Sequence, residues 1–493
     1  MEEYDGQWGK TMEIEVGYEA VVTVKGLGSN GEGIAEIDGM KIFVKYVLPG
    51  EQARIRIDKI HKSYAAASML ELLSTSPERV QPACPAYGRC GGCDLLHLTR
   101  KAELELKRKI VTDAFARLGG MRETATEPVL AFDSASVNMD GSTPAEERSP
   151  FHYRNKAQYA LQFDETASET RIGFFAEQSH TIVPIDSCLL QKQGNRQILA
   201  IISGWMQAFK HNAAGVDGVV VRTAEKTAEI MVGLRARDAK IPNVKILIEQ
   251  IKLAEPMLKS VVVYIPVYAG KSAGKSGGKD GVKSAAARAV VGMKSTVIWG
   301  EDAIFEELKG LRFRISPNSF FQVNTHMAEV LYEEIAKAAE LSEQETVFDL
   351  YCGTGSIALF LAADAQDVIG IDTVEEAVSD AKHNAKLNEI SNATFLCDKA
   401  EKALANMRRD QIDADVIILD PPRKGCHPTL IDTIHKTKTP RIVMVSCEPA
   451  TLARDVSSLC RDGHYAVTRV QPVDMFPGTA KIEAVVLLER RNP

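Results

Sequence analysis

One stretch decides the fold of this chain: TVFDLYCGTGSIALFLAADAQDVIGID, residues 346–372. Its pattern predicts four elements in order, namely a strand at 346–351, a glycine turn at 352–355, an apolar helix at 357–363 and a second strand at 367–371. A single glycine turn is weak evidence, and this one is not the GxGxxG pattern of dinucleotide-binding folds. Asp372, about 17 residues after the turn, stands where an acid binds ribose hydroxyls in nucleotide-binding sheets.

The same alternation of strands and helices continues to the end of the chain. Further elements are expected in order as a helix at 374–388 and strands at 393–396, 416–419 and 441–445. The strands end near polar residues, which are in chain order Asp372, Asp398, Asp420 and Cys447. Two last strands, at 465–474 and 482–490, are suited to pair as a hairpin. The pattern predicts an α/β protein with a Rossmann-like parallel sheet whose ligands lie along its carboxyl edge.

Cys447 stands between the strand at 441–445 and a helix that begins near Pro449. Unpaired amides and the helix dipole at such a junction favour a thiolate over a thiol, which makes this cysteine a candidate nucleophile. The alternative is a small buried cysteine that only packs. The motif SCEPATLARD, residues 446–455, does not decide between them by itself.

The whole-chain composition is that of an ordinary globular protein. The 493 residues, 45% hydrophobic and 25% charged, suggest several domains. No apolar run resembles a signal peptide or a membrane span. Nine cysteines without an export signal favour reduced thiols or metal ligands over disulfides, so we expect a cytoplasmic protein. We also expect a monomer. A net charge of -7 is mildly unfavourable for nucleic-acid binding, which would require local basic patches.

Residues 12–74 alternate short β-type runs with glycine turns, which predicts a small β-barrel. Its second half carries an excess of basic side chains, with Lys41, Lys45, Arg54, Arg56, Lys59 and Lys62 against Glu51 and Asp58. Such an excess on a fold often used for nucleic acid favours RNA binding. A barrel face that is merely solvated is the alternative.

Three cysteines lie close together in CPAYGRCGGC, with five residues and then two between them. Three thiolates are one short of the usual set of four for zinc or an iron–sulfur cluster. Cys188 is the only other cysteine before residue 352 and is the natural fourth. The predicted ligands are therefore Cys84, Cys90, Cys93 and Cys188. Spacing leaves both metals open, and four unrelated thiols are the remaining alternative.

The middle of the chain is less regular. An amphipathic helix is expected at 98–120 and a mixed α/β segment at 151–268. The stretches 133–149 and 270–292 have the composition of loops, and contact with RNA phosphates is an alternative role for the basic second stretch. The predicted domains are a barrel at 12–74, a central domain at 75–310 and the parallel-sheet domain at 311–493. The helix at 98–120 belongs to the central domain or packs on the last one.

Four motifs together resemble the RNA 5-methyluridine methyltransferases: DLYCGTGSIAL, DPPRKG, SCEPATLARD and VDMFPGTAKIE. The barrel is similar to the TRAM domain of many of these enzymes. CPAYGRCGGC with Cys188 resembles the iron–sulfur site of the branch that acts on 23S rRNA. The resemblance covers nearly the whole chain. It implies a class I S-adenosylmethionine-dependent methyltransferase fold, RNA as partner and a [4Fe–4S] cluster, with zinc as the alternative metal.

The resemblance also assigns two catalytic residues. Carbon 5 of uracil is a poor nucleophile until a thiolate adds to carbon 6, and Cys447 matches the cysteine that adds. A base then removes the proton from carbon 5, and Glu483 matches the catalytic glutamate of the closing motif. Relatives usually have histidine where this chain has Lys481, a departure that concerns a proton relay and not the base itself.

For S-adenosylmethionine the family pattern carries over to six positions, Gln322, Tyr351, Gly353, Asp372, Asp398 and Asp420. Asp372 is usually glutamate in relatives, and either carboxylate can accept hydrogen bonds from the ribose. The remaining cysteines are assigned to packing or to incidental thiols: Cys352, Cys397, Cys426 and Cys460.

Three other functions are weighed against this one. A radical enzyme would need CxxxCxxC, which the CxxxxxCxxC of this chain does not match. An adenine amino-group methyltransferase would normally have an aromatic residue where Arg423 stands. A non-catalytic RNA-binding or assembly factor is disfavoured by the intact Cys447 and Glu483. The sequence leaves open which uridine is modified, and whether it lies in 23S rRNA or in tRNA.

Overall fold

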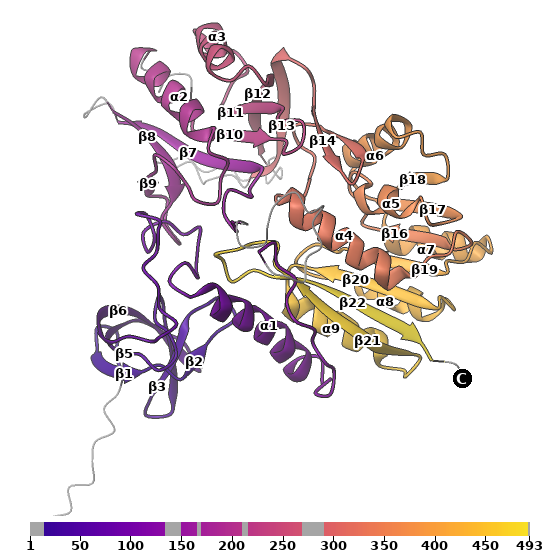
Figure 1. Cartoon of the computed structure of the whole chain (residues 1–493), viewed down its shortest axis with the longest axis horizontal. Coiled ribbons are helices and arrows are strands. Elements are labelled where there is room, and N and C mark those ends of the chain that lie inside the picture. The colour runs from indigo at the N-terminus through magenta and orange to yellow at the C-terminus, as the bar shows by residue number, and fades with distance from the viewer. Residues whose placement is uncertain (1–13, 134–148, 165–168, 210–214, 269–289, 492–493) are drawn as a thin grey trace, which may run out of the picture. The chain divides into compact units, whose positions relative to one another are not determined.

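The computed structural model describes residues 14–133, 149–164, 169–209, 215–268 and 290–491 (Figure 1). Contacts divide the chain into two compact units. The first contains the residues up to Gly88, Cys93–Leu106 and Gly478–Ala480, and the second contains Arg89–Gly92, Lys107–Pro477 and the residues from Lys481 on. The predicted loop at 133–149 and the insertion at 270–292 fall almost wholly outside the described residues, although 290–292 begin a strand. Among the described helices, none combines the length and the apolar character that a membrane span requires.

The first unit is built on a six-stranded sheet in the order β1-β5-β6-β4-β3-β2. Its strands are β1 (Glu19–Thr23), β2 (Gly26–Leu27), β3 (Gly33–Ile37), β4 (Met40–Val44), β5 (Gln52–Ile60) and β6 (Tyr64–Ser74). Alternate residues of β5 are buried in its core, namely Ala53, Ile55 and Ile57. β1 also contacts β3, near the other end of the order, so the sheet curls around this core. The curled sheet agrees with the predicted barrel.

The basic side chains predicted on this sheet are partly neutralised. Arg54 forms an ion pair with Glu71 at 2.8 Å, and Arg56 lies 3.7 Å from Asp58. Glu71 on β6 lies outside the stretch whose charges were counted from the sequence. The excess of positive charge on this face is therefore smaller than the sequence indicates.

The helix α1 (Arg100–Arg117) is divided between the units, since its residues up to Leu106 belong to the first and those from Lys107 on to the second. A seven-stranded sheet follows in the order β13-β12-β11-β10-β7-β8-β9. Its elements are β7 (Lys156–Asp164), β8 (Glu169–Phe175), β9 (Ile182–Pro184), α2 (Asn195–Phe209), β10 (Gly218–Thr223), β11 (Ile230–Arg235), α3 (Val244–Ala254), β12 (Leu258–Tyr268) and β13 (Val290–Gly300). Apolar residues of α2 and α3 pack on one face of this sheet, including Ile202, Trp205 and Leu247.

The C-terminal sheet also has seven strands, in the order β18-β17-β16-β19-β20-β22-β21. Its strands are β16 (Thr346–Leu350), β17 (Asp367–Asp372), β18 (Ala393–Cys397), β19 (Val416–Leu419), β20 (Arg441–Ser446), β21 (Tyr465–Val473) and β22 (Glu483–Arg490). β16 to β20 are parallel, and β22 is antiparallel to both β20 and β21. The predicted strands and the closing hairpin are thus confirmed.

Helices connect and cover this sheet: α4 (Thr325–Ala339), α5 (Ser356–Leu361), α6 (Glu375–Leu387), α7 (Ala400–Arg409), α8 (Pro428–His435) and α9 (Pro449–Cys460). The chain leaves β18 at one edge and returns to β19, beside β16. Such a switch in strand order opens a crevice at the carboxyl ends of the two strands, where ligands of α/β sheets bind. The sheet thus locates the functional site at the ends of β16 and β19.

The hairpin β14 (Ile304–Leu308) and β15 (Leu311–Ile315) connects the two large sheets. One hydrophobic core runs from Val262 on β12 through Phe313 on β15 to Met327 on α4. Because this core is continuous, contacts join the central and C-terminal segments into a single unit. The domain boundary expected at residue 310 therefore does not coincide with a boundary between the two compact units.

Candidate active site

Asp349 lies on β16, and Asp420 directly follows the neighbouring strand β19, on the same face of the C-terminal sheet. Asp349 is paired with Ile418, and Asp420 follows two residues later. Since side chains alternate between the faces of a strand, Asp420 projects from the same face as Ile418 and Asp349. Asp349 is fully buried, and burial, followed by the charge of Asp420, raises its pKa to about 8. Burial also raises the pKa of Asp420, to about 7.

Cys447 and Glu483 project from that face too. Ile418 is paired with Val443, and Val445 with Val485, so alternate residues of β20 and β22 share the face of Asp420. The last pair between β20 and β22 is Ser446 with Ala484. One step further along the same register, Cys447 stands opposite Glu483. Four neighbouring strands of the sheet therefore bring three carboxyl groups and one thiol to the same edge, namely those of Asp349, Asp420, Glu483 and Cys447.

Helix α4 covers this face. Tyr332 of α4 is buried, and its hydroxyl lies 2.7 Å from Oγ of Ser356. Burial, together with the charges of Asp420, Asp349 and Glu483, raises the pKa of Tyr332. The carboxyl groups therefore lie in a poorly solvated environment, where an unpaired charge is costly.

The Cys447 thiol has a raised pKa. Burial is the largest cause, and the carboxylate of Glu483 adds to it, whereas the guanidinium of Arg423 lowers the pKa. The expectation that the N-terminus of α9 would favour a thiolate is therefore wrong for the free protein. α9 begins only at Pro449, and the loss of water around the thiol disfavours the thiolate.

Glu483 is the first residue of β22 and is buried. Burial and the charge of Asp420 raise its pKa well above the usual range, while Arg423 lowers it. Its Oε2 has no hydrogen-bond partner among the described residues. A carboxylate in this environment binds a proton strongly, which is the property that a general base needs.

Arg423 and Asp349 are two residues of this site that the sequence did not single out. Arg423 follows the two prolines after β19, and its charge acts on both Cys447 and Glu483. DPPRKG contained the signal, but the sequence analysis used Arg423 only to argue against another substrate. Asp349 reads as the end of a strand, and only the register shows that it lies beside Asp420.

The glycine turn after β16 forms a cradle that fits a cofactor. Tyr351 has φ 77, a left-handed conformation unusual for its type, and donates its main-chain N–H to Ile371 at 2.9 Å. Gly353 has φ 55, and a Cβ there would meet nothing within 4 Å, so open space lies beside the turn. The turn and Asp420 follow neighbouring strands at the same edge of the sheet. The open space is therefore placed where a nucleoside cofactor can bind with a cationic group close to Asp420.

Asp372 is engaged by the turn itself. Its Oδ2 accepts from the N–H of Gly353 at 3.0 Å, and its Oδ1 accepts from Val374 at 2.8 Å. Each carboxylate oxygen retains a second lone pair for a ribose hydroxyl. Asp398 lies beside it, since its N–H donates to the main-chain O of Asp372 at 3.1 Å, and its carboxylate pairs with Lys402.

Gln322 lies in a loop that the central sheet holds firmly. Nδ2 of Asn155 donates to the main-chain O of Gln322 at 2.8 Å, and Arg222 donates to the main-chain O of Ser319 at 2.9 Å. The hydroxyl of Tyr264 donates to Pro317 at 2.8 Å. Gln322 itself is buried. Because these hydrogen bonds fix the backbone of the loop, they also fix the place from which its side chain projects.

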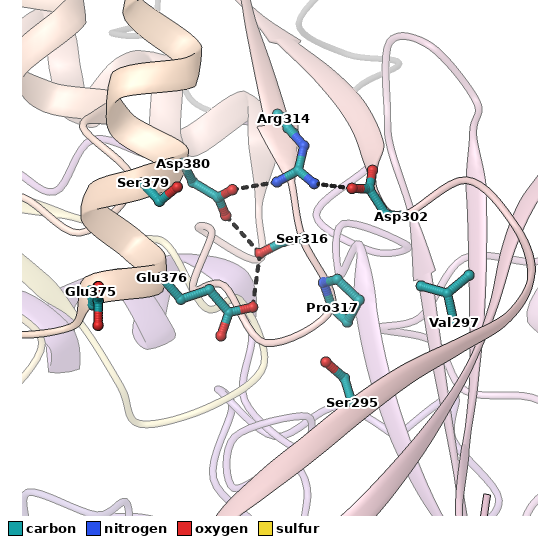
Figure 2. A pocket seen from close by; sticks show the side chains of 10 residues that line it. All are labelled: Ser295, Val297, Asp302, Arg314, Ser316, Pro317, Glu375, Glu376, Ser379 and Asp380. Carbon is teal, nitrogen blue, oxygen red and sulfur yellow. Dashed lines mark hydrogen bonds and ion pairs between the residues drawn. The ribbon is translucent and has the colours of Figure 1, made fainter.

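The start of this loop is tied to α6 beside a cavity of about 520 Å³. Figure 2 shows Arg314 between Asp302 and Asp380, and Ser316, whose hydroxyl lies 2.6 Å from Oδ2 of Asp380. None of the predicted site residues lines this cavity. The network braces the loop rather than forming part of the site at the sheet edge.

The cysteines fall into two groups. The predicted ligands are half-buried cysteines, with Cys84 and Cys93 in the first unit and Cys90 and Cys188 in the second. Within the parts of the chain that the structure describes, no group of three or more His, Cys, Asp or Glu could hold a metal ion. The metal site therefore stays a prediction from the sequence. Of the thiols assigned to packing or incidental positions, Cys352 and Cys426 are buried, Cys460 is half-buried and Cys397 is exposed.

A doubly wound sheet with this turn and these acids at its carboxyl edge defines the class of α/β proteins that bind a nucleoside or nucleotide cofactor at this edge. A family model described as tRNA (Uracil-5-)-methyltransferase matches residues 290–491, and the TRAM domain model matches residues 13–70. The chain belongs to the RNA (uracil-5-)-methyltransferase family, and it is an S-adenosylmethionine-dependent enzyme of that family.

Relatives match over nearly their full length. An uncharacterized RNA methyltransferase of Halalkalibacterium halodurans is 37% identical, over 96% of this chain and 97% of that protein. One from Clostridium tetani is also 37% identical, over 94% and 95%. The Pyrococcus abyssi tRNA (uracil-54, C5)-methyltransferase, solved with S-adenosyl-L-homocysteine, is 26% identical, with a TM-score of 0.69, over 95% of this chain and 99% of that one.

Proposed function

We propose that this enzyme methylates carbon 5 of a specific uridine in 23S rRNA, with Cys447 as covalent nucleophile and Glu483 as base. The Cys447 thiolate adds to carbon 6 of uracil, so that carbon 5 becomes nucleophilic. S-adenosylmethionine supplies the methyl group. Glu483 then removes the proton from carbon 5, and the electrons of the C5–H bond re-form the 5,6 double bond as the thiolate leaves.

The observation that carries this proposal is the position of Cys447 opposite Glu483, one step beyond the last pair of β20 with β22. Covalent addition and proton removal act on adjacent atoms of one ring, so both groups must reach it from one side of the sheet edge. Arg423 supports the thiolate, since its charge lowers the pKa of Cys447 against burial. The Cys447 proton leaves before addition, so rates are expected to rise with pH.

The cofactor part of the proposal assigns binding to the cradle beside this edge. Gly353, Asp372 and Asp398 would hold the nucleoside, and Asp420, Tyr351 and Gln322 would lie towards the transferred methyl group. Carboxylates with raised pKa values near this edge, Asp349 and Asp420, favour a cationic cofactor, because a positive charge stabilises their ionised forms.

Transfer RNA is the second candidate substrate. It is favoured by the likeness to the Pyrococcus abyssi tRNA enzyme, whose full length this chain covers. Ribosomal RNA is favoured by the motif CPAYGRCGGC with Cys188. The proposal gives these four cysteines a structural [4Fe–4S] cluster, with zinc as alternative, and places the enzyme with its RNA in the cytoplasm.

The test is to map 5-methyluridine in 23S rRNA and in tRNA from a strain that lacks the enzyme. We expect one or more positions in 23S rRNA to lose the methyl group and to regain it with the wild-type gene but not with Cys447→Ala. Loss confined to tRNA would select the second substrate. Unchanged methylation in both RNAs would contradict the proposal.

A further inference from the structure

A buried ion pair joins α1 to the end of β21. Nζ of Lys107 lies 2.6 Å from Oδ1 of Asp474 and 3.1 Å from the main-chain O of Phe476, to which it donates a second bond. Both charged side chains are fully buried. Taking two charges out of water costs more than such a pair usually returns in stability, so the pair is better explained by a geometry that it fixes.

That geometry concerns Glu483. β21 ends at Val473, whose cross-strand partner is Glu483, and Asp474 is the next residue. Lys107 therefore anchors Asp474, which is the residue next to the cross-strand partner of Glu483. The carboxyl Oε2 of Glu483 makes no hydrogen bond within the described residues, so the backbone at this end of the hairpin contributes strongly to the position of the carboxyl group.

Neutral hydrogen bonds hold the same turn. The N–H of Asp474 donates to Leu130 at 2.8 Å, Nδ2 of Asn324 donates to Met475 at 3.2 Å, and the hydroxyl of Tyr153 lies 3.3 Å from the O of Pro477. Each such bond is individually weak in net terms. Lys107 differs because one ammonium group binds a carboxylate and a main-chain oxygen two residues apart, which defines the direction of the turn.

We infer that Lys107 is a positioning residue for Glu483: by fixing the end of β21 it sets the distance from the carboxylate to carbon 5 of the bound uracil. The inference rests on the proposed covalent mechanism. A displaced base slows proton removal, the last step, and leaves thiolate addition and methyl transfer in place. The methylated covalent adduct between Cys447 and RNA then accumulates.

The test separates positioning from stability with a double variant. Lys107→Met alone leaves the Asp474 carboxylate buried without its cation and is expected to lower the melting temperature. Lys107→Met/Asp474→Leu replaces both charges by apolar groups and is expected to restore it. The double variant should still lose about tenfold to 10²-fold in kcat, the effect of a displacement of about 1 Å. Its KM for RNA should be unchanged, and a slow-migrating protein–RNA adduct should appear on a denaturing gel.

Three comparisons make the outcome decisive. Lys109→Met removes an exposed lysine of the same helix, paired with Asp113 at 2.9 Å, and should leave kcat and the gel unchanged. A double variant with wild-type kcat and no adduct, beside a Glu483→Gln protein that does accumulate adduct, would overturn the inference. If Glu483→Gln itself gives no adduct, the proposed base is wrong instead. Should the double variant not fold, Lys107→Arg gives the same test, since it keeps the charge and moves the donor.

Discussion

The charge of Arg423 lowers the pKa of the Cys447 thiol, against burial and the carboxylate of Glu483, which both raise it. The same guanidinium lowers the pKa of Glu483. Arg423 thus stabilises both anions that the proposed reaction needs, the attacking thiolate and the waiting base. Without it, burial among carboxyl groups would keep both groups protonated over a wider range of pH.

Arg423→Met is therefore expected to shift the acidic limb of the pH–rate profile to higher pH. Each unit of rise in the Cys447 pKa means about tenfold less thiolate at neutral pH. Single-turnover rates between pH 6 and 9 measure the shift. Arg423→Lys should recover part of the rate, and Lys424→Met, which alters the exposed neighbour, should not move the profile. A profile that stays in place in Arg423→Met would exclude this role.

Cys447→Ala is expected to lower methyl transfer by about 10³-fold or more, because no other group can add to carbon 6. RNA binding should change little, since the thiol is half-buried and contributes little contact area. Transfer of labelled methyl groups to unmodified RNA, beside a filter-binding measurement, checks both halves. Retention of a tenth of the wild-type turnover would remove Cys447 from the role of nucleophile.

Glu483→Gln is expected to permit addition and methylation but to stall proton removal. An amide has nearly the shape of the carboxyl group but cannot take up the proton, so the covalent intermediate persists. A denaturing gel with labelled RNA should show a slow-migrating protein–RNA species that is absent with the wild type. Normal RNA binding without this species would contradict the assignment of the base.

Much of the fold follows from local pattern. The strands at 346–351 and 441–445 were predictable because apolar, β-branched runs buried on both faces leave few alternatives. The edge position of Asp420 and Cys447 followed from the same pattern, since parallel strands align their carboxyl ends. Sequence motifs then identified the family, which residue spacing alone could not do.

The electrostatics of the site could not be predicted in this way. The pKa of Cys447 depends on burial and on groups from β22 and the segment after β19, so the local helix terminus suggested the wrong direction. The same holds for Lys107, whose partner Asp474 is 367 residues away in the chain. Long-range burial, and not local pattern, decides both cases.

The four-cysteine site has a prediction of its own. Anaerobically purified protein should be brown and carry about four irons per chain, as expected for [4Fe–4S] ligation by four thiolates. Replacing Cys84, Cys90, Cys93 or Cys188 by serine should cost iron and solubility before it costs cofactor binding, because methyl transfer needs no electron. Colourless protein with one zinc would exclude the cluster and keep a structural metal.

Asp349 links stability to pH. Burial and the charge of Asp420 raise its pKa to about 8 in the folded protein, whereas an unfolded Asp has a pKa of about 3.9. Between these values the folded state binds the extra proton, so this residue makes stability fall as pH rises from about 4 to 8. Asp349→Asn removes the ionisable group and should raise the free energy of unfolding at pH 8 by about 2–4 kcal/mol, with little effect at pH 4. Urea unfolding at both pH values measures the difference. An Asn variant with the same pH dependence as the wild type would show that Asp349 is already ionised in the folded protein.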